Sequence, residues 1–147
     1  MTLQAELPLG LPPSFASLVV NTDGASRGNP GPASIAYVIY DGSGEEVVAA
    51  ADEIGRATNN VAEYRALIAA LEHCARLGAG KVRVRSDSQL IVRQMQGRYK
   101  VRDAGLAELH AQASALCKGF DEVRFEHVGR EENKRADGLA QNALKNT

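Results

Sequence analysis

The strongest constraint on the fold is a change in hydrophobic period near residue 58. Before it, segments 18–23, 33–40 and 45–54 are rich in apolar and β-branched residues and are linked by short Gly-containing connections. Strands joined by such short connections run antiparallel, so we expect a three-stranded meander. After residue 58, apolar residues recur every three or four positions, which predicts an amphipathic helix. That stripe is formed by Val61, Tyr64, Leu67, Ile68, Leu71 and Cys74.

The rest of the chain alternates strands with helices. We expect strands at 81–86 and 123–128, and helices at 88–96, at 103–118 and from Glu132 or Asn133 to residue 144. A strand that follows a helical crossover returns parallel to its predecessor. The order therefore predicts an α/β fold in which a mixed five-stranded sheet has three antiparallel and two further parallel strands, with helices on both faces.

The length of 147 residues suits one domain. Residues 1–16 contain three prolines and little periodicity, so we expect a flexible N-terminal tail there and a folded domain over 17–147. No apolar run reaches the roughly 18 residues that cross a bilayer, and the N-terminus lacks the pattern of a secretory signal. We expect a cytoplasmic monomer with no membrane partner.

Cys74 and Cys117 show no metal-ligand spacing and should be buried, reduced thiols.

The formal net charge of −1 argues mildly against a nucleic-acid partner, but it hides an asymmetry. Between Lys81 and Arg102 the chain carries seven basic residues and one acid, Asp87. A basic patch beside carboxylates is what a polyanion bound through metal ions would need. A solvated charged face is the alternative interpretation of this run.

Four acidic residues lie near the expected ends of elements: Asp23, Glu63, Asp87 and Asp137. In mixed α/β sheets, ligands gather at the carboxyl ends of the parallel strands, where Asp23 and Asp87 fall. If the four acids converge, they repel one another unless cations are bound. Hard oxygen ligands without a Cys/His set favour Mg²⁺ or Mn²⁺ over zinc. Spacing alone leaves convergence open, because each acid taken singly also suits a cap or an exposed turn.

Four motifs resemble those of the type 1 ribonuclease H family, in the family's order. They are NTDGASRGNPGP at 21–32, TNNVAEYRAL at 58–67, SDSQL at 86–90 and ENKRADGLA at 132–140. The resemblance covers about residues 18–143 and implies a ribonuclease H-like fold. It also implies an endonuclease that hydrolyses the RNA strand of RNA–DNA hybrids by a two-metal-ion mechanism, leaving 5′-phosphate and 3′-hydroxyl ends. Activity on double-stranded RNA stays open.

The resemblance assigns the four acids to two Mg²⁺ ions, with Mn²⁺ as a substitute. A binding module that kept the fold and lost catalysis is the competing hypothesis, and the intact acid set speaks against it. Short hydroxyl and amide groups can contact a phosphate or a 2′-OH, and a glycine gives close backbone access. The positions that match family residues contacting the nucleic acid or ordering the site are Gly24, Asn29, Thr58, Asn60, Ser88 and Asn133.

The chain departs from the family pattern in two places. Bacterial members often carry an extra helix and a basic protrusion after the third motif, whereas segment 97–102 here leads almost directly into the next helix. The chain thus resembles the short, archaeal-like branch, and we expect Arg98 and Lys100, with Tyr99 and Arg102, to hold the hybrid instead. The second departure concerns the family's catalytic histidine. His127 offers a titrating group and Arg130 a fixed charge, so both are candidates.

Overall fold

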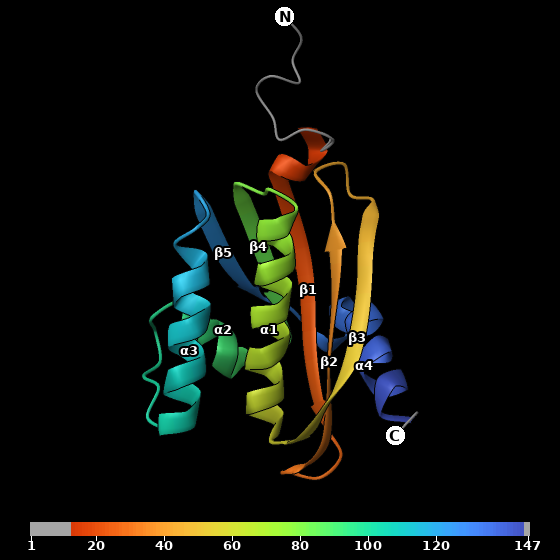
Figure 1. The fold of residues 1–147 in the computed structure, drawn as a ribbon, viewed down its shortest axis with the longest axis vertical. Coiled ribbons are helices and arrows are strands. Elements are labelled where there is room, and N and C mark those ends of the chain that lie inside the picture. The colour runs from red at the N-terminus through yellow and green to blue at the C-terminus, as the bar shows by residue number, and fades with distance from the viewer. Residues whose placement is uncertain (1–12, 146–147) are drawn as a thin grey trace, which may run out of the picture.

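The computed structural model describes residues 13–145 and contains five strands and four α-helices in that range (Figure 1). Their order confirms the predicted sequence of elements. In chain order they are β1 (Ser17–Ser26), β2 (Gly31–Tyr40), β3 (Glu46–Ala57), α1 (Asn59–Arg76), β4 (Lys81–Ser86), α2 (Gln89–Met95), α3 (Ala104–Cys117), β5 (Glu122–His127) and α4 (Lys134–Lys145), with short 3-10 helices η2 (Pro13–Ala16) and η3 (Arg130–Asn133).

The strands form one sheet in the order β3-β2-β1-β4-β5. β2 pairs antiparallel with both β1 and β3, whereas β4 runs parallel to both β1 and β5, as predicted. The hairpin between β1 and β2 is tighter than its Gly- and Pro-rich sequence suggested. Its ladder continues to the pair Ser26 and Ala33, so half of segment 25–32, which lies between the first two predicted strands, belongs to β1 and β2.

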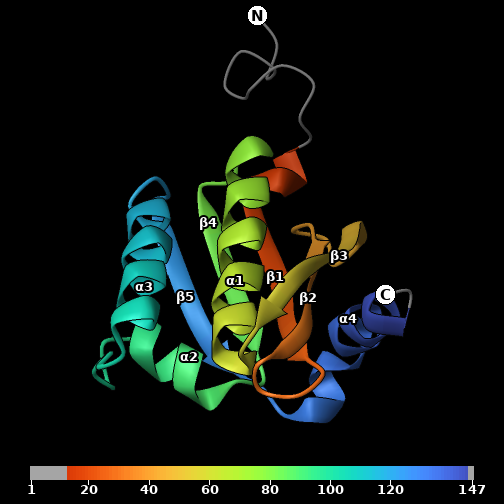
Figure 2. The ribbon, with the colours of Figure 1, turned by 60° about the horizontal axis from the view of Figure 1, so that its bottom comes forward.

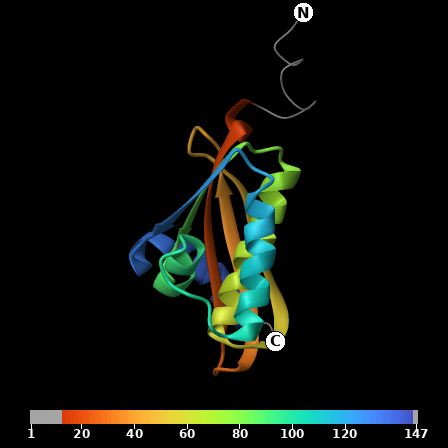
Figure 3. The ribbon, with the colours of Figure 1, turned by 90° about the vertical axis from the view of Figure 1, so that its left-hand side faces the viewer.

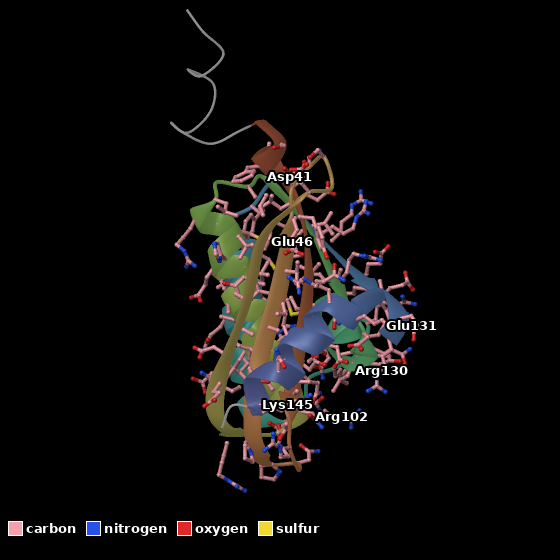
Figure 4. All side chains as sticks on the ribbon, turned by 90° about the vertical axis from the view of Figure 1, so that its right-hand side faces the viewer. Asp41, Glu46, Arg102, Arg130, Glu131 and Lys145 are labelled. Carbon is pink, nitrogen blue, oxygen red and sulfur yellow. The ribbon has the colours of Figure 1, made fainter. Side chains whose placement is uncertain are left out.

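Helices cover both faces of the sheet, as predicted. On one face, Leu18 and Val20 of β1 pack with Leu67 and Leu71 of α1 in the main core, and α3 lies beside α1 (Figures 1 and 3). On the other face, α4 packs on β1, β2 and β3 (Figures 2 and 4). The contacts of α4 are made largely by alanines, which let the helix approach the sheet closely. They include Ala25, Ala36 and Ala140, with Leu144.

The described chain begins folded before the expected boundary at residue 17. Phe15 packs against the main core, and the Ser14 and Ala16 carbonyls accept hydrogen bonds from Gly42 N at 2.7 Å and Gly80 N at 2.9 Å. Pro13–Ala16 therefore belongs to the domain rather than to a tail. The rest of the predicted tail, residues 1–12, lies outside the described residues. Between residues 13 and 145 no helix is long and apolar enough to cross a membrane.

The two cysteines are free thiols. Cys74 is fully buried, as expected, while Cys117 is only half-buried. Burial raises the pKa of Cys74 to about 12 and that of Cys117 to about 11, so both thiols are protonated and poor nucleophiles at neutral pH.

Candidate active site

Three carboxylates meet where β1 and β4 end. Asp23 of β1, Glu63 of α1 and Asp87, which follows β4, each offer an oxygen within 4.8 Å of the others. The parallel pairing of β1 with β4 places the carboxyl ends of the two strands side by side. α1 starts at this end of the sheet and carries Glu63 in its second turn. Convergence, which spacing could not establish, is thus a property of the fold.

Gly24 sets the distance between β1 and α1. Its N–H donates to Glu63 Oε1 at 3.0 Å, which holds the carboxylate over the strand end. A Cβ at this position would lie 2.3 Å from the Ala62 carbonyl carbon and 2.4 Å from Glu63 N. We expected this glycine to give a substrate close access to the backbone. α1 fills the space that a side chain would take at Gly24, and access of a substrate to this backbone stays a prediction.

Asp137 comes to the same site from the opposite face of the sheet. It lies in the first turn of α4, and its carboxylate is close enough to Asp23 to raise the pKa of that residue. It stands outside the close group of three, but its charge acts on both Asp23 and Glu63. The four acids predicted from the sequence are therefore neighbours.

The carboxylates are partly buried and lie close enough to repel one another when ionised. Burial, then the charges of Asp87 and Asp137, raises the pKa of Asp23 to about 8, against a smaller lowering effect of Arg130. Burial and the neighbouring Asp23 and Asp87 charges likewise raise the pKa of Glu63 well above its usual range. Divalent cations would relieve this repulsion and keep the groups ionised. An all-oxygen donor set suits a hard ion such as Mg²⁺.

Two buried asparagines, Asn21 and Asn133, form hydrogen bonds that hold the residues of the site in place. Asn133 is fully buried, and its Nδ2 donates to Thr22 O at 2.9 Å and, at 3.5 Å, to Asp87 Oδ1. Its Oδ1 accepts from Nδ2 of Asn21, which also donates to Glu132 O at 3.2 Å. Because its side chain is enclosed, Asn133 orders the site and does not reach out to a nucleic acid.

Sequence reasoning missed Asn21. It is 4% exposed and lies two residues before Asp23, on the same face of β1. The available signal was a polar amide inside an otherwise apolar strand, since a buried amide needs hydrogen-bond partners. Its partners lie more than 100 residues away in the chain, so only the fold identifies them.

The remaining predicted substrate contacts gather at helix N-termini. Thr58 caps α1, with Oγ1 accepting from Val61 N at 3.2 Å, and Asn29 Oδ1 accepts from Asn59 N at 3.0 Å. Asn60 is half-buried in the first turn of α1. Ser88 caps α2, with Oγ accepting from Ile91 N at 3.3 Å. The structure thus gives Asn29, Thr58 and Ser88 a local capping or bracing bond.

Segment 96–103 joins α2 to α3 without an intervening helix, so the described chain has no protrusion there. Arg98 and Lys100 are exposed in it, and Tyr99 is 46% exposed. The segment is anchored by Gln94, whose Nε2 donates to Lys100 O at 3.3 Å. Its basic side chains therefore project from a fixed backbone.

The two candidates for the histidine's role occupy different places. Arg130 begins η3, and its charge lowers the pKa of Asp23 against the larger effects that raise it (Figure 4). His127 ends β5, is exposed and lines a hollow that contains none of the four acids. Of the two, Arg130 is the one whose charge acts on Asp23.

A sheet in this order, with carboxylates from β1, α1 and the end of β4 at its centre, defines the ribonuclease H-like class of α/β proteins. The family model described as reverse transcriptase-like matches residues 21–143. The chain is also similar to the solved RNase H1 from the halophilic archaeon Halobacterium salinarum. The two are 46% identical with a TM-score of 0.87, over 89% of this chain and 99% of the other. The chain belongs to the type 1 ribonuclease H family.

Three further comparisons also find proteins that are similar to this chain. The chain is similar to LC11-RNase H1, solved in complex with an RNA/DNA hybrid, with 44% identity and a TM-score of 0.84 over 88% of this chain and 97% of that one. Ribonuclease HI of Halobacterium salinarum is 49% identical over 122 residues, 83% of this chain and 61% of its own length. The bifunctional protein Rv2228c of Mycobacterium tuberculosis is 47% identical over 128 residues, 86% of this chain and 35% of its own length. The chain therefore spans less than two thirds of these two curated relatives.

Proposed function

We propose that the chain is a cytoplasmic, monomeric endonuclease that hydrolyses the RNA strand of RNA–DNA hybrids. The observation that carries the proposal is the meeting of Asp23, Glu63 and Asp87 within 4.8 Å, with raised pKa values at Asp23 and Glu63. Such a cluster is unfavourable unless it binds cations, which suits a nuclease and would be hard to retain in a binding module. The likeness to LC11-RNase H1, solved with an RNA/DNA hybrid, supports the choice of substrate.

Asp23, Glu63, Asp87 and Asp137 would hold two Mg²⁺ ions, for which Mn²⁺ would substitute. When bound, such ions supply an activated water and stabilise the departing 3′-oxygen of a phosphodiester, which leaves 5′-phosphate and 3′-hydroxyl ends. Gly24 N fixes the Glu63 carboxylate, and Asn133 Nδ2 reaches Asp87. These bonds keep the ligands in place before the ions bind, which is what preorganisation of such a site requires.

Substrate recognition would be shared between neutral and charged groups. Asn29, Thr58 and Asn60 lie around the N-terminus of α1, beside Glu63, where their polar side chains and the helix dipole favour a phosphate. Ser88 offers a similar setting at α2. Arg130, close enough to influence Asp23, would orient the scissile phosphate and neutralise its charge.

Arg98 and Lys100 would replace the basic protrusion of other family members. Both side chains are exposed on the anchored segment between α2 and α3. Contacts of this kind weaken as salt rises, since binding releases counterions from the nucleic acid. Replacing both with Ala should raise the Michaelis constant and flatten its dependence on salt. An unaltered salt dependence would count against their role.

The test of the proposed function is cleavage of an end-labelled RNA–DNA hybrid in Mg²⁺, with Asp23→Asn as the matched inactive variant. We expect cleavage of the RNA strand alone, products that ligate through a 5′-phosphate, and loss of activity in the variant. The same assay on double-stranded RNA decides whether that substrate is also cleaved. Absence of hybrid cleavage by the native chain in both Mg²⁺ and Mn²⁺ would overturn the proposal.

A further inference from the structure

The basic residues between Lys81 and Arg102 have no role in the carboxylate site described above, and the fold places them on different elements. Lys81, Arg83 and Arg85 lie on β4, and Arg93 lies on α2. Arg83 and Arg93 line a hollow of about 460 Å³ together with Arg124 and His127 of β5. Residues far apart in the sequence thus bring three guanidinium groups and one imidazole to a single surface site.

The hollow carries a net positive charge that its own ion pairs do not cancel. Glu126 is the one carboxylate of its lining, and Glu126 Oε1 is bonded to Arg85 Nε at 3.0 Å. Arg124 pairs with Glu122. Within the part of the chain that the structure describes, no carboxylate pairs with Arg83 or Arg93, and the Arg93 guanidinium donates a hydrogen bond to the neutral Gln96 Oε1 at 3.0 Å. Two guanidinium groups are therefore left to bind an anion.

The register of the sheet adds a second argument. Arg83 and Arg124 are directly paired across β4 and β5, and like charges in that relation repel one another. An anion between them would convert this repulsion into attraction. Guanidinium groups bind phosphate oxygens with two parallel hydrogen bonds, which makes a phosphate diester a well-matched occupant.

The hollow also lies close to the carboxylate site. His127 pairs with Ser86, the residue immediately before Asp87. Arg83 of β4 is four residues before Asp87, which follows the strand, and thus roughly 13 Å away at the rise of an extended chain. A nucleic-acid strand whose scissile phosphate sits at the carboxylates would therefore bring phosphates a few nucleotides away within reach of the hollow.

We propose that this hollow binds backbone phosphates of the nucleic-acid strand that continues past the cleavage site. The proposal rests on the proposed function for its substrate and adds a site outside the carboxylates. Arg83 and Arg93 make the main contacts, with Arg124 and His127 contributing at its rim. This contact strengthens binding of substrates long enough to reach it and leaves the chemical step unchanged.

The test measures binding of hybrids to the Asp23→Asn protein, so that cleavage plays no part. Three substrates are compared: a short blunt hybrid, the same hybrid with a single-stranded tail on its RNA strand, and the same with a tail on its DNA strand. One tail is expected to raise affinity and steepen the dependence of log K on log salt. Arg83→Ala should reduce the slope of log K against log salt by roughly 0.7–0.9, the value of one phosphate contact. Arg83→Glu should abolish the gain in affinity from the tail.

Arg76→Ala is the matched control, because Arg76 is an exposed arginine at the C-terminal end of α1. It should keep the full gain from the tail. Equal gains in Arg83→Glu and in the control would overturn the proposal, as would the absence of a gain from either tail in the parent protein. Failure of the proposed function is separate, since it would appear as absent cleavage of the blunt hybrid by the native chain.

Discussion

Asn21 Nδ2 donates a hydrogen bond to Asn133 Oδ1 at 3.0 Å, and this bond ties the central strand to the start of α4. The orientation of both amides is fixed by acceptors, since their N–H₂ groups face Thr22 O, Glu132 O and the Asp87 carboxylate. Asn133 lies three residues after Arg130 and four before Asp137. The asparagine pair therefore sets how two of the site's groups meet Asp23.

The first prediction concerns this pair. Asn133→Ala should lower the free energy of unfolding by about 1–3 kcal/mol, because Thr22 O and Asn21 lose a buried partner. It should also weaken Mg²⁺ binding to the free protein, since Asp87 loses its hydrogen-bond donor. Chemical denaturation and calorimetric titration measure the two effects. Asn21→Ala and the double variant complete a cycle, in which strictly additive effects would show that the amides are not coupled.

The second prediction is a pH dependence of stability in the metal-free protein. The pKa of Asp23 is raised from 3.8 to about 8, so its contribution to stability is complete below pH 3.8 and is lost as the pH rises through 8. The free energy of unfolding in EDTA should therefore fall between pH 5 and pH 8, by about 1.4 kcal/mol per pH unit where only the unfolded carboxyl is ionised. Asp23→Asn should flatten this dependence. The exposed Asp52→Asn is the control and should leave it unchanged.

A third prediction follows for the metal itself. Because Asp23 and Glu63 have raised pKa values, cation binding near neutral pH must displace protons. Mg²⁺ should release protons on binding, bind more tightly as the pH rises from 6 to 8, and remove the loss of stability seen in EDTA. Calorimetry in buffers of different ionisation enthalpy counts the protons. Binding that is independent of pH and of buffer would refute the electrostatic description of the site.

Much of this could be predicted from the sequence, for identifiable reasons. The element order follows from hydrophobic period, which is a local property, and the four acids follow from motifs in a fixed order. The hairpin ends were missed because Gly31 and Pro32 are typical of loops, yet the ladder continues through the bond from Arg27 N to Pro32 O at 2.7 Å. Tertiary pairing overrode local preference there.

The roles of Gly24 and Asn133 could not be predicted because both depend on what packs against them. Gly24 follows a catalytic candidate, and α1 fills the space that a side chain would take there. Asn133 matched a motif position that contacts substrate or orders the site, and only its burial separates the two. Which face of an element is covered is decided by distant segments, so local sequence carries no signal for it.

The fourth prediction uses two glycines with opposite surroundings. Gly24→Ala would place a Cβ 2.3 Å from the α1 backbone, so it should destabilise the protein by about 1–3 kcal/mol or more and displace Glu63. Gly138→Ala is the matched control, because it lies within α4 with no atom near the new methyl group. It should stabilise the helix by up to about 1 kcal/mol. Thermal denaturation of both variants checks this, and equal effects would contradict the packing argument.

The fifth prediction separates Arg130 from His127. Arg130 acts on Asp23, so Arg130→Ala should lower kcat by on the order of tenfold or more, as expected when a charge beside a reacting phosphate is lost. It should also raise the pKa of Asp23 and shift the acid limb of the pH–rate profile upward. Arg130→Lys keeps the charge and should restore part of the activity.

His127→Ala should behave differently, because His127 lines the hollow and not the carboxylate site. We expect kcat and the shape of its pH profile to stay unchanged. The KM should rise for a hybrid that carries the single-stranded tail found to raise affinity. Steady-state kinetics of both variants between pH 6 and pH 9 make the comparison. A larger loss of kcat in His127→Ala than in Arg130→Ala, with an altered pH profile, would show that His127 takes the role of the family's catalytic histidine, since it is the candidate with a titrating imidazole.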